Sequence, residues 1–209
     1  MPALDIAAFT AAIDEGAIPV DLRSPTHFAA AHVPCAVQLQ FGWNDLGQRA
    51  HRFLPQNAAY VLIAETDGLG AEAEVMLGES GFRVRGYLRG GLKVWIDRGL
   101  SYRTTKTINV TQLQAKVAAG DQIHLLDVRE EWEFDQGHIQ GACLMPHSAL
   151  WEKARELDPQ EHWHIICSDG VRAGAAISML ERLGFRDCTL VLGGMDTWLD
   201  AGYAVTRAG

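Results

Sequence analysis

The chain has 209 residues, of which 48% are hydrophobic and 21% are charged, and this suits one large globular domain or two of about 100 residues each. The formal net charge is −8 and there is no run of lysine or arginine, which argues against nucleic acid or an anionic membrane surface as a partner. No stretch is long and apolar enough to predict a membrane span.

The first 16 residues contain no basic segment and no long apolar core, so we expect no secretory signal and a cytoplasmic location. The cysteines are Cys35, Cys143, Cys167 and Cys188. They lack paired metal-ligand spacing, and a chain of this length needs no disulfides, so we expect no metal site. Cys143 and Cys188 lie in apolar segments, where we expect inert core thiols.

Taken in order, the chain predicts a short amphipathic helix over residues 4–16 and a strand over 18–23. The same order returns as a helix over 110–120 and a strand over 123–129. Asp21 and Arg23 at the end of the first strand recur as Asp127 and Arg129, at a shift of 106 residues.

A second set of matches recurs at a shift of 103 residues and includes a Gly-Gly pair and a tryptophan. The matching segments are residues 81–83 with 184–186 and residues 90–97 with 193–200. Recurrence of this kind indicates an internal duplication of about 100 residues, hence two domains of like fold. We place them at residues 1–102 and 108–209, joined by a polar, basic linker over 101–109.

Each copy alternates short apolar strands with helices, which favours a mainly parallel central sheet with helices on both faces. In such sheets, ligands bind beyond the carboxyl ends of the strands. In the second copy, Cys167 stands at this place, because Ile165 and Ile166 end an apolar strand and a helical pattern follows from Ala173 to Leu183.

The segment from Cys167 to Ala173 is the candidate active site. It reads Cys167-Ser168-Asp169-Gly170-Val171-Arg172-Ala173. Gly170 allows a tight backbone path, and inward-facing amides next to a helix amino terminus would favour negative charge. Together with the cation of Arg172, this predicts a lowered pKa for Cys167 and a thiolate nucleophile at neutral pH.

These features together resemble the rhodanese family, in which a similar six-residue cysteine loop follows a buried strand and opens a helix. The resemblance covers nearly the whole chain, twice. In the second copy it includes residues 127–130, 133–134 and 137–142, the cysteine loop, the Gly193-Gly194 pair and Trp198. It implies two tandem rhodanese-like α/β domains.

The resemblance also implies a catalytic second domain and a degenerate first one. The shift of 103 places Ala64 opposite Cys167, and Leu69 opposite Arg172. Neither the thiol nor the arginine remains, and a carboxylate from Glu65 or Asp67 would repel anions in the cradle.

The implied activity is sulfur transfer. Cys167 would accept a sulfane sulfur from a small donor, such as thiosulfate, mercaptopyruvate or a persulfide, and pass it to cyanide or a thiol through a cysteine persulfide. Backbone amides of residues 168–173 would stabilise the developing charge, so the implied transfer needs no metal and no organic cofactor. Asp127 and Arg129 would support the loop by hydrogen bonds, whereas Arg172 could either hold an anionic donor or pair with a carboxylate.

Other functions stay open from the sequence. Ser168 and Asp169 stand where thiosulfate-using relatives often carry basic residues, which leaves the donor undecided. A cysteine phosphatase of the related fold carries Cys-x5-Arg, a wider loop than the Cys-x4-Arg spacing here, and is the weaker alternative. A persulfide carrier or a protein-interaction module without turnover is the other alternative.

Overall fold

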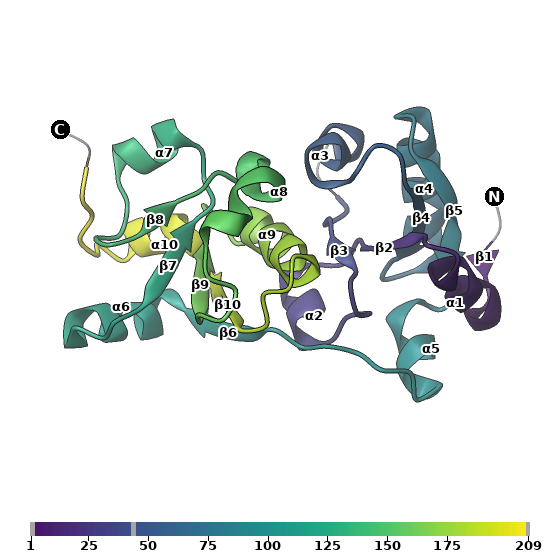
Figure 1. Cartoon of the computed structure of the whole chain (residues 1–209), viewed down its shortest axis with the longest axis horizontal. Coiled ribbons are helices and arrows are strands. Elements are labelled where there is room, and N and C mark those ends of the chain that lie inside the picture. Colours follow the sequence, from purple (N-terminus) through teal and green to yellow (C-terminus); the bar gives the residue numbers. More distant parts are fainter. Residues whose placement is uncertain (1–2, 43–44, 208–209) are drawn as a thin grey trace. The chain divides into compact units, whose positions relative to one another are not determined.

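The computed structural model describes residues 3–42 and 45–207, and the chain divides into two compact units, Met1–Thr104 and Thr105–Gly209 (Figure 1). Within the described residues, each unit contains one sheet of five parallel strands flanked by helices. The predicted fold class of two tandem α/β domains is therefore confirmed.

The elements of the first unit alternate strand and helix throughout. They are β1 (Ala3–Leu4), α1 (Ile6–Asp14), β2 (Ile18–Asp21), α2 (Pro25–Ala30), β3 (Val37–Gln38), α3 (Leu46–Phe53), β4 (Ala59–Ile63), α4 (Asp67–Glu79), β5 (Arg83–Leu88) and α5 (Gly91–Asp97). The strand order in the sheet is β1-β5-β4-β2-β3.

The second unit repeats this plan, with two short 3₁₀ turns around one of its helices. Its elements are β6 (Lys106–Asn109), α6 (Val110–Ala119), β7 (His124–Asp127), α7 (Glu131–Gln136), β8 (Cys143–Leu144), η1 (His147–Ala149), α8 (Leu150–Lys153), η2 (Ala154–Glu156), β9 (Trp163–Ile166), α9 (Val171–Arg182), β10 (Cys188–Leu192) and α10 (Gly194–Asp200). The strand order is β6-β10-β9-β7-β8, which matches the first sheet position by position and confirms the duplication.

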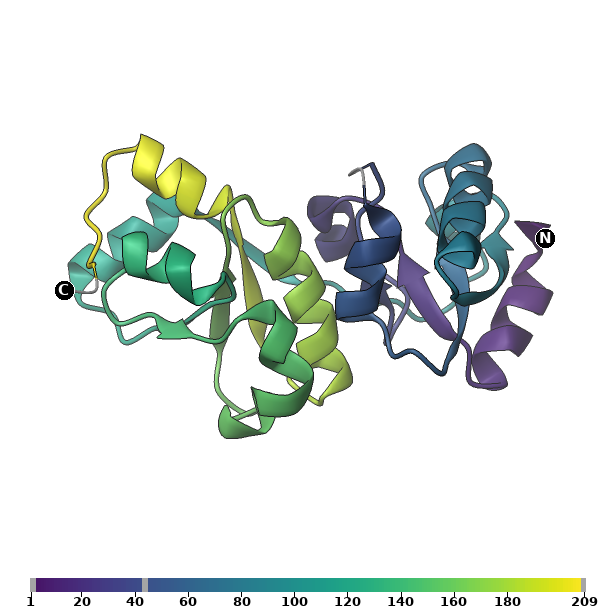
Figure 2. The same ribbon diagram turned by 90° about the horizontal axis from the view of Figure 1, so that it is seen from above.

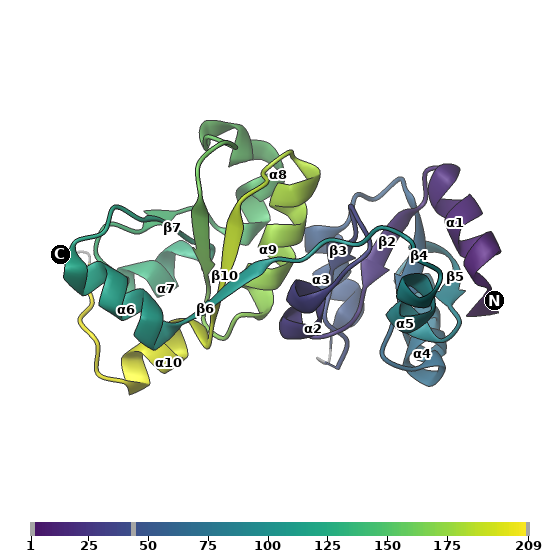
Figure 3. The same ribbon diagram turned by 90° about the horizontal axis from the view of Figure 1, so that it is seen from below.

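The second sheet is covered on both faces, as a parallel sheet requires. Figure 3 shows α9 and α6 on opposite sides of β9 and β10, and Figure 2 separates α9 from α10, drawn in yellow, in the same way. Every residue of β9 is buried, and the face under α6 and α10 is filled by a cluster that includes Leu113, Ile166 and Trp198. The strand that leads to Cys167 is thus fixed on both sides.

The predicted linker over residues 101–109 is wrong at its carboxyl end. Lys106–Asn109 forms β6, which pairs with β10 in parallel, and Asn109 then caps α6 by accepting from the backbone N–H of Gln112 at 2.9 Å. The strand has polar residues because it lies at the sheet edge, where only Ile108 points into the core. The polar composition that suggested a linker belongs to an edge strand.

Cys143 and Cys188 were both expected to be buried in the core, and the structure confirms this for only one of them. Cys188 in β10 is buried, whereas Cys143 is exposed because it opens β8, the strand at the opposite edge of the sheet. No helix in the described part of the chain is long and apolar enough to cross a membrane.

A buried histidine on β9 gives the second domain a predicted pH dependence. His164 is 5% exposed, and its Nδ1 has no hydrogen-bond partner among the described residues. Burial, reinforced by the positive charges of His162 and Lys116, lowers the pKa of His164 to about 4 from the usual 6.5. Since the unfolded chain binds the proton more tightly, stability is full above about pH 6.5 and falls as the pH drops towards 4.

We therefore expect the variant His164→Leu to lose less stability than wild type between about pH 7 and about pH 4.5. The difference in the free energy of unfolding should reach up to about 3 kcal/mol, as measured by urea denaturation. Equal pH dependence in the two proteins would show that another group carries the acid sensitivity.

Candidate active site

The loop between β9 and α9 places Cys167 at the carboxyl end of a central strand. Cys167 directly follows Ile166, the last residue of β9, and α9 begins at Val171. Gly170 caps the helix with φ +100°, a left-handed backbone conformation that favours glycine. This glycine lets the chain turn back over the sulfur within three residues.

Two backbone amides converge on the Cys167 sulfur. Sγ accepts from the N–H of Gly170 at 3.1 Å and from the N–H of Ala173 at 3.3 Å, and the Cys167 residue is fully buried. The amides belong to the first turn of α9, whose free N–H groups and dipole favour negative charge. The loop therefore forms the cradle of donors that its sequence predicts.

The predicted lowering of the Cys167 pKa is wrong. Burial has the largest influence and raises the pKa to about 11, and the carboxylate of Asp169 adds to the increase. The amides of Ala173 and Gly170 and the charge of Arg172 act in the opposite direction without outweighing burial. Burial therefore acts against the stabilisation that the two amides give to the thiolate.

Arg172 turns to a carboxylate rather than to the sulfur. Its Nη1 and Nη2 donate to Glu133 Oε2 and Oε1 at 2.6 and 2.7 Å, and Nη2 also donates to Ser168 Oγ at 2.6 Å. The Ser168 hydroxyl in turn donates to Glu133 Oε1 at 2.9 Å. Of the two orientations left open by the sequence, the structure has the one in which Arg172 braces the loop.

Glu133 on α7 lies within the residues that carry the family resemblance, but the sequence alone did not indicate its role in the site. Burial alone would raise its pKa, but hydrogen bonds from Arg172, the backbone N–H of Glu130 and Ser168 outweigh burial and lower the pKa to about 2. The available signal was Arg172 itself, because a cation placed beside a buried strand end requires a carboxylate. The sequence around Arg172 does not indicate which carboxylate pairs with it.

Asp127 and Arg129 form a buried brace outside the reacting centre. Arg129 Nη2 donates to Asp127 Oδ2 at 2.7 Å and to the carbonyl of Gly137 at 2.9 Å, and Arg129 Nη1 donates to the carbonyl of Glu133 at 3.2 Å. The brace therefore holds α7 against β7. Because the first domain contains the same pair as Asp21 and Arg23, at 2.6 Å, it belongs to the fold in both copies.

The start of α10 holds the loop from behind. The backbone N–H groups of Met195 and Asp196 donate to the carbonyls of Cys167 and Ser168 at 2.8 and 2.9 Å. A Cβ on Gly194 would lie 2.2 Å from the Ser168 oxygen, so only glycine permits this approach. With the two carbonyls held on this side, the amides farther along the loop are free to face the sulfur.

The remaining loop residues lie as follows. Asp169 Oδ1 accepts from the backbone N–H of Val171 at 3.0 Å and lies 3.7 Å from Cys167 Sγ. Ala173 is buried, and Val171 is the first residue of α9. Of the loop residues, Asp169, Gly170 and Ala173 thus reach the sulfur. Ser168 and Arg172 bind Glu133 instead, while Asp127 and Arg129 act on α7.

The loop after β4 in the first domain, which corresponds to the cysteine loop, contains different side chains. Ala64 follows β4 in the place of Cys167, and the Glu65 carboxylate pairs with His27 Nδ1 at 2.5 Å. A cavity of about 420 Å³ at this end of the sheet is lined by these three residues and by Gly91, among others. The first domain therefore has a cavity at the carboxyl ends of its strands, and Ala64 is one of the residues that line it.

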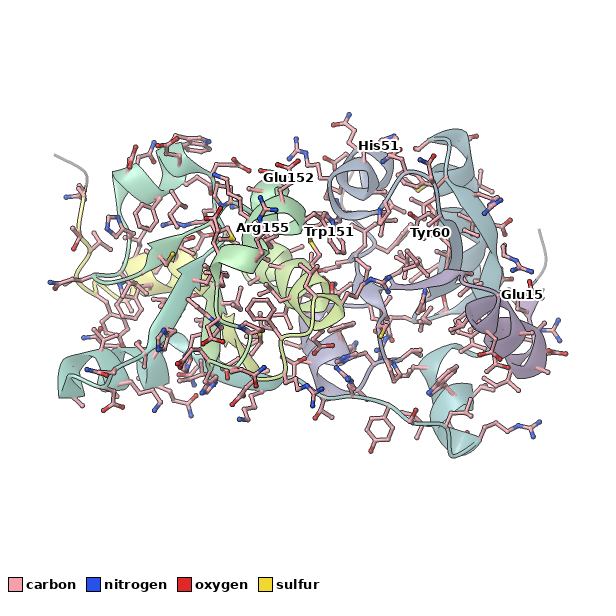
Figure 4. All side chains as sticks on the ribbon, viewed as in Figure 1. Glu15, His51, Tyr60, Trp151, Glu152 and Arg155 are labelled. Atoms are coloured by element: carbon pink, nitrogen blue, oxygen red, sulfur yellow. The ribbon has the colours of Figure 1, made fainter. Side chains whose placement is uncertain are left out.

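A larger cavity of about 560 Å³ lies in the second domain but excludes the cysteine loop. Trp151, Glu152 and Arg155, labelled in Figure 4, line it together with Leu183 and Phe185. The last two precede β10, so this cavity adjoins the amino-terminal end of that strand. It therefore lies at the end of the sheet where ligands of parallel α/β domains do not usually bind.

Comparison with known proteins gives matches to both halves of the chain. The family model described as "Rhodanese-like domain" matches residues 5–98 and 109–201. The putative sulfur carrier protein YrkF of Bacillus subtilis is 30% identical over 130 residues, which are 62% of this chain and 65% of that protein. The chain thus spans just under two thirds of this relative.

Shorter relatives match about one domain. The putative sulfurtransferase YtwF of Bacillus subtilis is 32% identical over 93 residues, which cover 44% of this chain and 89% of that protein. Among solved structures, a rhodanese-related protein from Thermoplasma volcanium has 33% identity and a TM-score of 0.44, covering 49% of this chain and 99% of that one.

Proposed function

Because the chain belongs to the Rhodanese-like domain family in both of its halves, we propose that it transfers a sulfane sulfur through a persulfide on Cys167. The donor would be a small molecule such as thiosulfate, mercaptopyruvate or a persulfide, and the acceptor would be cyanide or a thiol. Relatives of the chain carry the names of sulfurtransferases and of a sulfur carrier, which supports this class of function.

The convergence of two amide donors on the Cys167 sulfur carries the proposal. In the first step, the Cys167 thiol loses its proton and Sγ bonds to the outer sulfur of the donor. The bond between that sulfur and the rest of the donor breaks, and the rest leaves with the bonding electrons and takes up the proton. In the second, an acceptor nucleophile removes that sulfur from the persulfide. The amides of Gly170 and Ala173 would stabilise the negative persulfide, so the transfer needs no cofactor and should follow ping-pong kinetics.

The direct test is to incubate the protein separately with thiosulfate, mercaptopyruvate and glutathione persulfide and to measure its intact mass. We expect at least one donor to add one sulfur atom, which peptide mapping locates at Cys167 and which cyanide removes. Mapping is needed because Cys35 and Cys143 are exposed thiols. Absence of a cyanide-labile sulfur at Cys167 with all three donors would contradict the proposal.

A persulfide carrier is the second candidate, and two observations favour it. One relative is named a putative sulfur carrier, and Cys167 is fully buried, which restricts access for a small acceptor. Steady-state thiocyanate formation from donor and cyanide distinguishes the two functions. Multiple turnovers indicate an enzyme, whereas a loaded protein that resists cyanide and loses its sulfur only to a partner protein indicates a carrier.

We further propose that the first domain does not transfer sulfur, and that restoring the thiol alone would not change this. The loop there is capped by Thr66 with an extended backbone, whereas the second domain has the left-handed Gly170. In the background Cys167→Ser, we expect Ala64→Cys to gain no cyanide-labile sulfur at position 64, as measured by peptide mapping after donor treatment. A sulfur adduct there would show that the first loop is a competent cradle.

A further inference from the structure

The cavity of about 420 Å³ in the first domain lies at the end of the sheet where ligands of parallel α/β domains usually bind. Arg23, which lies just after β2, and Ala64, which directly follows β4, both line it. Because Ala64 stands there in place of the cysteine, the cavity has no part in the proposed sulfur transfer. Its polar groups therefore need an explanation of their own.

Arg23 is a buried cation with one nitrogen unused. The residue is 8% exposed, and its Nε and Nη2 donate to the two carboxylate oxygens of Asp21 at 2.9 and 2.6 Å. Nη2 also donates to the carbonyl of Ala31 at 2.6 Å. Nη1 has no hydrogen-bond acceptor among the described residues, although the donors of a buried guanidinium are normally satisfied.

The equivalent arginine of the second domain uses this nitrogen. Arg129 repeats the bonds to Asp127, but its Nη1 also donates to the carbonyl of Glu133 at 3.2 Å. The two braces thus differ at one nitrogen, which the main chain of α7 binds in the second domain. In the first domain the nitrogen belongs to a side chain that lines a cavity, and an acceptor atom of a bound molecule would complete the hydrogen bonds of Arg23.

The same cavity contains a carboxylate of which only one oxygen is engaged. Glu65 Oε1 pairs with His27 Nδ1 at 2.5 Å, whereas Oε2 has no partner in the part of the chain that the structure describes. The other two charged side chains of the lining, Lys93 and Asp97, pair with each other. The cavity therefore offers one unused donor on a cation and one unused carboxylate oxygen.

The rest of the lining is apolar or without a side chain. Besides a pair of glycines it contains three alanines together with Leu92 and Ile96. Apolar walls with a few polar groups are typical of sites for small molecules. A carboxylate is the preferred partner of a guanidinium, whereas a ligand that carried only this negative charge would meet Glu65 without compensation. A ligand with a carboxylate, an ammonium group and an aliphatic body satisfies all of these features.

We propose that the first domain binds a small aliphatic zwitterion of the amino-acid class in this cavity. The carboxylate of the ligand accepts from Nη1 of Arg23, its ammonium group donates to Oε2 of Glu65, and its aliphatic part lies against the apolar wall. The inference is independent of the proposed sulfur transfer, because it uses no residue of the cysteine loop. It gives the domain without the catalytic cysteine a ligand of its own.

The experiment titrates the full-length protein by isothermal calorimetry, to ligand concentrations of about 10 mM. One probe is L-leucine, whose two charges lie on one carbon, and the other is 5-aminopentanoate, whose charges lie at its two ends. We expect at least one of them to bind. For leucine the analogues with a single charge are 4-methylpentanoate and isopentylamine, and for 5-aminopentanoate they are pentanoate and pentylamine. Each analogue should bind about 10-fold more weakly than its parent, or less.

Two variants place the binding in the cavity. Glu65→Gln keeps the size of the side chain and removes its charge, so the affinity should fall about 10-fold. Ala30→Trp enlarges an exposed residue of the lining without changing the core and should abolish binding. The matched control is Glu72→Gln, which removes an exposed carboxylate of α4 outside the lining and should bind like wild type. Arg23 itself is kept, because its loss would leave Asp21 buried and unpaired.

Three results would overturn the inference: no binding of either amino acid, binding of the analogue without an ammonium group as tight as that of its parent, or unchanged affinity in Glu65→Gln or Ala30→Trp. Amide chemical shifts of the ¹⁵N-labelled protein give a second readout, in which the ligand should shift Ala64 and Gly91 and leave Gly170 in place. Cys167→Ser should bind the ligand like wild type, so a failure of the sulfur-transfer proposal leaves this test intact.

Discussion

Replacement of Cys167 by serine should abolish sulfur transfer, with a loss of about 10⁴-fold or more, the scale on which removal of a catalytic nucleophile acts. The hydroxyl occupies nearly the same space and can accept from the amides of Gly170 and Ala173, so the loop should keep its shape. A hydroxyl is a far weaker nucleophile than a thiol and cannot hold a persulfide. The measurement is thiocyanate formation with any donor that loads the wild-type protein.

The matched control is Cys188→Ala, which removes the other buried thiol of the second domain. Cys188 lies in β10, and burial together with the charges of Glu181 and Asp187 raises its pKa to about 12. We expect the control variant to retain its activity. Substantial transfer by Cys167→Ser, or loss of transfer in the control, would place the reacting thiol elsewhere.

The second large effect is expected for Glu133→Gln. The change keeps the shape of the side chain but converts two charge-assisted hydrogen bonds to Arg172 into contacts that cannot balance its charge. Because the pair is largely buried, the free energy of unfolding of the second domain should fall by about 2–3 kcal/mol. Sulfur transfer should fall by about 10- to 100-fold, since Ser168 and Arg172 at the two ends of the loop both depend on this carboxylate.

Urea denaturation and single-turnover loading check the two parts of this prediction. Glu131→Gln is the control, because Glu131 is an exposed carboxylate on the same helix, α7, and should change neither quantity appreciably. The charge-exchanged variant, Glu133→Arg with Arg172→Glu, should recover part of the lost stability. If Glu133→Gln has no effect on either measurement, the ion pair does not hold the loop in solution.

The same pair gives a pH signature whose sign follows from the lowered pKa of Glu133. The pKa falls from 4.5 to about 2, so the carboxylate stabilises the fold fully above about pH 4.5 and less as the pH falls through 2. The variant Glu133→Gln lacks this contribution. Its unfolding should therefore depend less on pH than that of wild type in this acidic range.

The fold and the position of the loop were predictable because both follow from local patterns. The repeat shows in residue types at fixed shifts, and a buried strand followed by a helix-forming segment places Cys167 at a strand end. Gly170 allows the tight turn within the loop itself. None of these inferences needs knowledge of a contact between distant residues.

The electrostatics of the site were not predictable, because they depend on burial and on tertiary contacts. Glu133 and Arg172 are 39 positions apart, and nothing near either residue identifies the other as its partner. Full burial of Cys167 reverses the sign of its pKa shift, although the amides lie where the sequence suggested. The polar strand β6 was missed for the related reason that its place at the sheet edge is a property of the whole sheet.

Gly194, which lets the carbonyls of Cys167 and Ser168 approach α10 closely, has a counterpart in the first domain. A Cβ on Gly91 would lie 2.7 Å from the Ala64 carbonyl, and both Gly91 and Gly194 have a left-handed backbone. The close approach is therefore retained in the copy whose loop has Ala64 in place of the cysteine. The Gly-Gly pair after the last strand thus belongs to the architecture of both domains, whereas the cysteine and the left-handed glycine three positions after it are found in the loop of the second domain alone.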